Sequence, residues 1–206
     1  MRKLRLQVQV SVDGFIADTN GSNDWMLWSN WDDKWNWDDE LKKYISDILG
    51  SVDCILLSRK MATGGFFEHW QQAAQNPEDP RFAYASKVNE IHKVVFSKTL
   101  KKPEWDNTTI ASGDLVVEIN KLKNQNGKDI IVYGGATLAS SLIKAGLIDE
   151  LQLLINPVVL GNGMPIFDRI DHRLNLQLIE ARPFDCGIVV QIYESKKEKQ
   201  AGLRVS

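Results

Sequence analysis

Three short apolar runs of this sequence end in small or positively charged residues, the residue types that hold phosphate groups. The runs end at Ser58-Arg59, at Ser97-Lys98 and at Gly134-Gly135. Serine hydroxyls, cations and the backbone amides beside glycine all bind phosphate oxygens. Each pair is a weak signal by itself. Their recurrence after apolar runs favours a phosphate-containing ligand at the edge of an α/β sheet where the parallel strands end.

The pair Gly134-Gly135 separates an apolar run, residues 130–133, from a segment with helical spacing. Because the two glycines lack side chains, an anionic group can approach the backbone closely. The helix predicted to begin near Ala136 would offer that group its first, unpaired amides and the positive end of its dipole. The plainer alternative is a tight turn without a ligand, the commoner meaning of two glycines after a strand.

A second candidate cradle is Ser58-Arg59-Lys60-Met61, which follows the compact apolar run 52–57. A serine followed by two cations suits a phosphate, and the alternative is a solvated basic turn. After it, we expect the chain to turn through residues 62–65, which include two adjacent glycines. We expect a loop over residues 71–80, a polar stretch bounded by proline.

Five of the seven tryptophans lie between Trp25 and Trp37. One interpretation is a buried aromatic face, because Trp28, Trp31 and Trp35 follow helical spacing. The other is a pocket for a flat ring, lined by indoles and one carboxylate. The candidate carboxylates are Asp24, Asp32, Asp33 and Asp38. Asp38 also suits the N-cap of a helix over residues 39–49.

The elements that would position these residues alternate between strands and helices, which predicts an α/β domain. Strands are expected at residues 2–12, 52–57, 93–97, 108–111, 130–133, 151–160, 174–181 and 188–194. Helices are expected at residues 39–49 and 82–92, after an N-cap at Asp114, and from Ala136 to a C-cap at Gly146. Residues 129–160 form a βαβ crossover between parallel strands. The last two strands predict an antiparallel hairpin.

Composition limits the remaining possibilities. The 206 residues suit one domain, expected at residues 1–194, followed by a polar tail at 195–206 that we expect to be disordered. A net charge of −2 implies no attraction to nucleic acid, and no apolar run approaches the ~18 residues of a membrane helix. Two cysteines suggest no disulfide framework, so we expect a cytoplasmic protein. Three scattered histidines predict no metal site.

Four motifs in their order resemble the dihydrofolate reductase-like superfamily. They are VSVDGFIAD, ILLSRKM, KVVFSKTL and IIVYGGATLASSLIKAGLIDELQLLINPVVLGNGMPIF. More narrowly, the sequence resembles the branch related to the carboxyl-terminal reductase domain of bifunctional riboflavin-biosynthesis proteins. The resemblance covers nearly the whole chain except the tail, and the block after the two glycines is its most specific part.

The resemblance implies a three-layer α/β fold with a mainly parallel central sheet, a C-terminal antiparallel hairpin, and NADPH as hydride donor. It places the pyrophosphate and the other phosphates near two segments. These are Gly134, Gly135, Ala136, Thr137 and Leu138 for the first, and Ser58, Arg59, Lys60 and Met61 for the second. It implies that Ser97 and Lys98 meet the adenosine end and its 2′-phosphate. Ile16, Ala17 and Gly21 would lie near the nicotinamide.

The Trp-rich segment departs from the family's spacing, so the proton donor is not carried over by position. Asp32 and Asp33 are the nearest catalytic candidates, and Asp13 and Trp25 are the candidate substrate contacts. We expect reduction of a small aminopyrimidine or pterin-like heterocycle, as in 5-amino-6-(5-phosphoribosylamino)uracil reductases or dihydrofolate reductases. The alternatives are a non-catalytic NADP(H)-binding or sensing protein and a protein whose glycine turns are only structural. A homodimer is expected from the family and from surplus aromatic surface.

Overall fold

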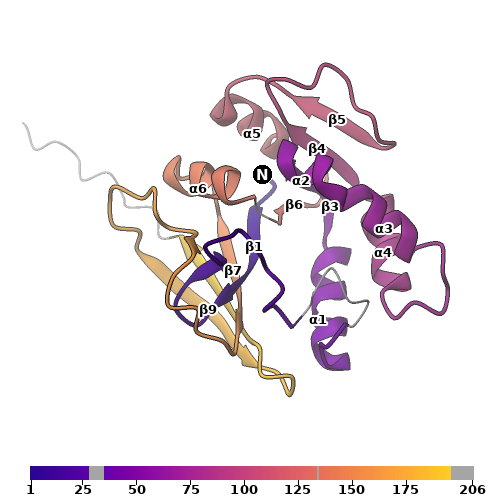
Figure 1. Cartoon of the computed structure of the whole chain (residues 1–206). Helices are drawn as coiled ribbons and strands as arrows, with labels where there is room; N and C mark the ends of the chain where they lie inside the picture. Colours follow the sequence, from indigo (N-terminus) through magenta and orange to yellow (C-terminus); the bar gives the residue numbers. More distant parts are fainter. Residues whose placement is uncertain (28–34, 134, 196–206) are drawn as a thin grey trace, which may run out of the picture.

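The computed structural model describes residues 1–27, 35–133 and 135–195 (Figure 1). In this part of the chain, helices cover both faces of an eight-stranded sheet. The strands of that sheet are β1 Leu4–Ser11, β3 Val52–Ser58, β4 His92–Phe96, β5 Thr108–Ala111, β6 Asp129–Val132, β7 Glu150–Asn156, β9 Leu176–Pro183 and β10 Val189–Ser195. The helices are α1 Asp39–Gly50, α2 Arg59–Met61, α3 Phe67–Ala73, α4 Phe82–Glu90, α5 Leu115–Lys123 and α6 Ala136–Lys144.

The strand order is β5-β4-β3-β6-β1-β7-β10-β9. All neighbours from β5 to β7 are parallel, whereas β10 runs antiparallel to both β7 and β9. The crossover from β6 through α6 to β7 joins two parallel strands that are not neighbours, because β1 lies between them. The predicted α/β fold, with its mainly parallel sheet and C-terminal antiparallel hairpin, is therefore confirmed.

The two faces of the sheet pack against separate hydrophobic clusters. Alternate residues of β1, including Leu4 and Leu6, are buried on the side of α5 and α6. On the opposite side, α1 contributes the apolar stripe Leu41, Ile45 and Leu49 to a cluster that also contains residues of α3 and α4. Burial of apolar area favours folding by about 25 cal/mol per Å². The alternating apolar residues of the strands and the apolar stripes of the helices therefore hold the layers together.

Predicted helix ends are confirmed. The Asp38 carboxylate accepts the N–H of Leu41 at 2.8 Å and begins α1. The Asp114 carboxylate likewise accepts two N–H groups at the start of α5. Gly146 takes the left-handed conformation, φ 64°, just after α6, where its N–H donates to Ile143 O. Short polar side chains thus cap the amino ends of α1 and α5, and a glycine follows the carboxyl end of α6.

Part of the loop predicted from residue 71 is wrong, because α3 extends to Ala73. The turn predicted over residues 62–65 is present as a kink within Ala62–Phe66, between α2 and α3. Gly64 and Gly65 have non-helical dihedral angles there, with φ of +96° at Gly65. The buried side chains of α3, Phe67, Trp70 and Ala73, lie on one face of that helix and hold it against the sheet. Tertiary burial therefore outweighs the local loop signal at residues 71–73.

A small second sheet pairs β2 Phe15–Ala17 with β8 Met164–Pro165 in antiparallel fashion. The sequence did not predict this pairing, which joins segments about 150 residues apart. None of the described helices is long and apolar enough to cross a membrane. The described residues also contain no group of three or more side chains arranged to hold a metal ion.

Candidate cofactor and substrate site

The carboxyl ends of β3, β4 and β6 lie side by side and carry the three predicted phosphate-binding segments. Ser58 is the last residue of β3 and is level with Phe96 of β4. Val132, the last residue of β6, is level with Leu56 of β3. The parallel arrangement therefore brings Ser58-Arg59, Ser97-Lys98 and Gly135 to one edge of the sheet, where open α/β sheets bind ligands. Gly134 lies outside the described residues.

Gly135 packs directly on Ser58. Its φ is +83°, a conformation that side chains disfavour. A Cβ atom at this position would lie 2.5 Å from Ser58 Oγ and 2.9 Å from Ser58 Cβ, so the space admits only glycine. The Ser58 hydroxyl also accepts the N–H of Met61 at 3.2 Å and begins α2. Two of the predicted cradles are thus in contact.

Helix α6 directs the start of its backbone toward this edge. The N–H of Ala139 donates to Gly135 O at 3.0 Å, so the amides of Ala136, Thr137 and Leu138 precede the first intrahelical hydrogen bond. The Leu138 side chain is buried in the cluster beneath α6. Leu138 can therefore face a ligand only through its backbone, and the same turn offers an anion three amides and a positive dipole end.

The cations at this edge are unpaired within the described residues. Arg59, Lys60 and Lys98 are exposed, and none forms an ion pair there. Ser97 is buried, and its hydroxyl accepts the N–H groups of Thr99 at 3.2 Å and Leu100 at 3.0 Å. Ser97 thus shapes the turn that presents Lys98, and its direct contact with a ligand stays a prediction.

Asp13, after the end of β1, anchors a neighbouring loop. Its carboxylate accepts the Ser11 hydroxyl at 2.6 Å, the N–H of Gly161 at 2.7 Å and the N–H of Leu160 at 3.2 Å. The bond from Ser11 holds the pKa of Asp13 below its ordinary value. These contacts give Asp13 a structural role, while the predicted substrate contact stays untested. The predicted nicotinamide neighbours lie close by: Ile16 and Ala17 in β2, and Gly21 in the turn beyond it.

Asn156, at the end of β7, fastens the start of the Trp-rich segment to the sheet. Its fully buried side chain accepts the N–H of Leu27 at 3.0 Å. The same amide donates to Leu154 O and to the Gln9 side chain. The Trp25 indole nitrogen is buried without a hydrogen-bond partner among the described residues. Sequence reasoning missed Asn156, whose one signal was a polar residue at the end of an apolar run.

Buried tryptophans surround a pair of tyrosines on the α1 side of the sheet. Trp35 and Trp37 are 8% and 3% exposed, which confirms the core interpretation for Trp35. The Trp35 ring centroid lies 5.7 Å from that of Tyr84, and the Tyr84 hydroxyl lies 3.1 Å from the Tyr133 hydroxyl. Burial raises the pKa of Tyr84 to about 12. Residues Trp28, Trp31, Asp32 and Asp33 lie outside the described residues.

The family model described as RibD C-terminal domain matches residues 2–190. Uncharacterized protein YyaP of Bacillus subtilis (strain 168) is 37% identical over 195 residues, which cover 93% of this chain and 94% of YyaP.

Two solved structures share the fold. One is a diaminohydroxyphosphoribosylaminopyrimidine deaminase/5-amino-6-(5-phosphoribosylamino)uracil reductase from Thermotoga maritima, with TM-score 0.64 and 14% identity over 95% of this chain and 57% of that one. The other is dihydrofolate reductase from Enterococcus faecalis complexed with NADP(H), with TM-score 0.58 and 14% identity over 95% of this chain and 97% of that one. At these identities the likeness shows the fold alone.

Proposed function

We propose that this chain, which belongs to the RibD C-terminal domain family, is an NADPH-dependent reductase of a small heterocyclic substrate. The observation that carries the proposal is the contact between Gly135 and Ser58, which leaves no room for a Cβ atom. It joins the two predicted phosphate-binding segments at the carboxyl ends of the parallel strands, where ligands bind in such folds.

The residues at this edge fit a phosphorylated dinucleotide. The first amides of α6 would hold the pyrophosphate, together with the backbone at Gly135. Arg59 and Lys60 would neutralise phosphate charge, and Lys98 would meet a 2′-phosphate, the group that distinguishes NADPH from NADH. When bound, NADPH supplies the hydride. The protein binds and orients the two reactants and excludes water from them.

The substrate we propose is a planar aminopyrimidine or pterin-like ring. The aromatic cluster on the α1 side of the sheet includes Tyr133 and Met61, beside the proposed cradle, and apolar and aromatic groups are the usual lining for such a ring. The names of the Thermotoga and Enterococcus neighbours support this class, because they include a 5-amino-6-(5-phosphoribosylamino)uracil reductase and a dihydrofolate reductase. Trp25 and Asp13 remain the predicted substrate contacts, and Asp32 and Asp33 remain the predicted acids.

Replacing Lys98 with alanine is expected to weaken NADPH binding about 10-fold and to leave NADH binding unchanged. The reason is the loss of one charge-assisted hydrogen bond to the 2′-phosphate, which NADH lacks. Tryptophan fluorescence titrations with both nucleotides measure the effect. Lys102→Ala, which removes an exposed cation from the same loop, is the matched control.

An equal loss for both nucleotides would contradict the role of Lys98. If neither nucleotide binds the unaltered protein, the proposed cofactor is wrong, and so is the proposed reductase activity. Tight NADPH binding without turnover of any aminopyrimidine or pterin would favour the alternative function, a non-catalytic NADP(H)-binding or sensing protein.

We also propose a cytoplasmic homodimer. Strand β9 forms an edge of the sheet and exposes Leu176, Leu178 and Ile179, the last two at 52% each. An open apolar edge favours pairing with another chain. Both cysteines are free thiols, as in a reducing compartment. Light scattering should give twice 23.3 kDa, and Leu178→Lys should give a monomer. A monomeric unaltered protein would contradict the dimer.

A further inference from the structure

Tyr133 joins the aromatic cluster to the cofactor-binding edge. It follows β6 directly and stands two residues before Gly135. Its side chain packs on the α1 side of the sheet, against the same cluster as Met61 and Leu27. Met61 belongs to α2, and its sulfur would lie 3.8 Å from a Cβ atom at Gly135. Leu27 is the residue that Asn156 fastens to the sheet. Tyr133 therefore packs in one cluster with a residue of the proposed cradle and with Leu27.

The Tyr133 hydroxyl forms a pair with the Tyr84 hydroxyl at 3.1 Å. Tyr84, in α4, is only 2% exposed, and its ring contacts Trp35 and Trp70 with centroids 5.7 and 5.1 Å away. Tyr133 is half-buried, so it is the more exposed member of the pair. Packing fixes Tyr84, and Tyr84 in turn fixes the position of the Tyr133 hydroxyl.

We propose that the Tyr133 hydroxyl binds the substrate, by a hydrogen bond to a carbonyl oxygen or ring nitrogen of a planar heterocycle. Tyr84 acts as a positioning residue that orients this hydroxyl. The inference rests on the proposed function and deepens it, because it names a group that selects the substrate class.

The chemistry of the pair favours this role. A hydroxyl has one donor hydrogen and two acceptor lone pairs, so the Tyr133 hydroxyl can bond to a ligand as well as to Tyr84. Burial raises the pKa of Tyr133 well above its ordinary value, so the phenol stays neutral at pH 7 and remains a donor. A ligand that excludes water from this hydroxyl without offering it a hydrogen bond binds more weakly. The pair therefore selects rings that carry an acceptor and discriminates against purely apolar rings.

The test measures binding of lumazine and of pterin, two flat rings with carbonyl acceptors, to protein saturated with NADP⁺. The oxidised cofactor supplies no hydride, so binding is separated from turnover. Tyr133→Phe is expected to weaken the binding of at least one ring 10- to 30-fold and to leave NADP⁺ affinity unchanged. Tyr44→Phe is the matched control, because it removes another tyrosine hydroxyl, which donates to Glu180 instead.

A double-mutant cycle tests the positioning role of Tyr84. In Tyr84→Phe ring binding should weaken about 3-fold, because the Tyr133 hydroxyl loses the partner 3.1 Å away. If Tyr84 acts only through Tyr133, the double variant Tyr84→Phe/Tyr133→Phe should bind the rings no more weakly than Tyr133→Phe.

The outcomes separate the two proposals. Failure of the unaltered protein to bind NADPH or NADP⁺ would overturn the proposed function. Normal cofactor binding with equal ring affinity in Tyr133→Phe and the unaltered protein would overturn the inference alone. Normal cofactor binding with no binding of either ring would also overturn it. Unchanged ring affinity in Tyr84→Phe, or a double variant that binds more weakly than Tyr133→Phe, would remove the positioning role of Tyr84.

Discussion

Replacing Gly135 with alanine is expected to weaken NADPH binding at least 100-fold. The φ of +83° disfavours any side chain, at a cost of roughly 1–2 kcal/mol. The added Cβ would also lie 2.5 Å from Ser58 Oγ, so the turn before α6 and the turn after β3 must separate. Because both turns are proposed to hold phosphates, their separation misplaces the backbone amides of the cradle. Isothermal calorimetry with NADPH measures the loss.

Gly146→Ala is the matched control for this substitution. Gly146 stands just after the other end of α6, has φ of +64°, and has nothing within 4 Å of an added Cβ. It therefore imposes the backbone strain without the collision, and it should lower stability by about 1 kcal/mol with NADPH affinity intact. The double variant Gly135→Ala/Ser58→Gly, which removes the colliding atoms, should recover part of the binding. Equal affinity of Gly135→Ala and the unaltered protein would refute the cradle.

The elements near the site were predictable where local chemistry decides them. Apolar runs predicted the parallel strands. The capping residues Asp38 and Asp114 predicted where helices begin, and Gly146 predicted where one ends. Gly64 and Gly65 likewise break the helical path where their turn signal predicts it. The failure at residues 71–73 has the opposite cause, because the polar composition is a local loop signal whereas the burial of Trp70 and Ala73 is a tertiary effect that keeps this stretch helical. Local signals can be read from the sequence, whereas tertiary burial depends on which segments pack together in the fold.

The composition of the site was predictable in the same partial way. Serine, glycine and lysine after strands indicated phosphate binding, but only the strand order places β3 beside β6 and thus Ser58 against Gly135. Asn156 meets Leu27 across 129 positions, and Tyr84 meets Tyr133 across 49. Neither pair has a local signal. Residues that act through long-range hydrogen bonds therefore emerge from the structure alone.

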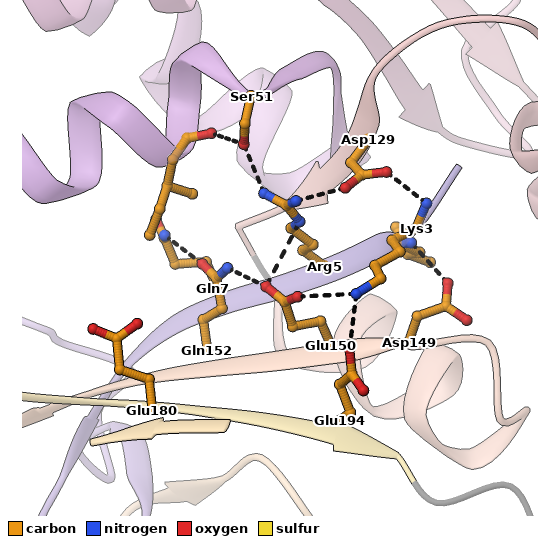
Figure 2. A network of polar contacts seen from close by, with 12 residues as sticks. Lys3, Arg5, Gln7, Ser51, Asp129, Asp149, Glu150, Gln152, Glu180 and Glu194 are labelled. Atoms are coloured by element: carbon orange, nitrogen blue, oxygen red, sulfur yellow. Dashed lines mark hydrogen bonds and ion pairs between the residues drawn. The ribbon is translucent and has the colours of Figure 1, made fainter. Parts of the chain in front are cut away.

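A network of charged and polar side chains joins strands of the sheet at their amino ends, opposite the proposed cradle (Figure 2). Arg5 is at its centre, with a guanidinium nitrogen 2.5 Å from Asp129 and another 3.6 Å from Glu150. A third contact joins Arg5 to the Ser51 hydroxyl at 2.7 Å. The three charged side chains are only 12% to 23% exposed. They come from the amino ends of β1, β6 and β7 and so fasten three neighbouring strands to each other.

Replacing Arg5 with methionine is expected to lower the free energy of unfolding by about 3 kcal/mol. Methionine keeps much of the side-chain volume but leaves Asp129 and Glu150 as mostly buried carboxylates without their shared cation, and such groups are costly. Urea denaturation at pH 7 measures the change. Lys43→Met is the control, because its ion pair with Asp47 is exposed and should contribute within about 0.5 kcal/mol.

Two further measurements separate this network from the site. Without Arg5, Glu150 keeps only the more distant Lys3, at 3.8 Å, as an ion-pair partner. Arg5→Met/Glu150→Gln removes this poorly compensated charge, so part of the lost stability should return. NADPH affinity should stay unchanged in Arg5→Met, since the network lies at the amino ends of the strands and the proposed cradle lies at their carboxyl ends. A stable Arg5→Met protein would show that the carboxylates find other partners. A weakened NADPH affinity at full folding would show that the two edges of the sheet are coupled through its central strands.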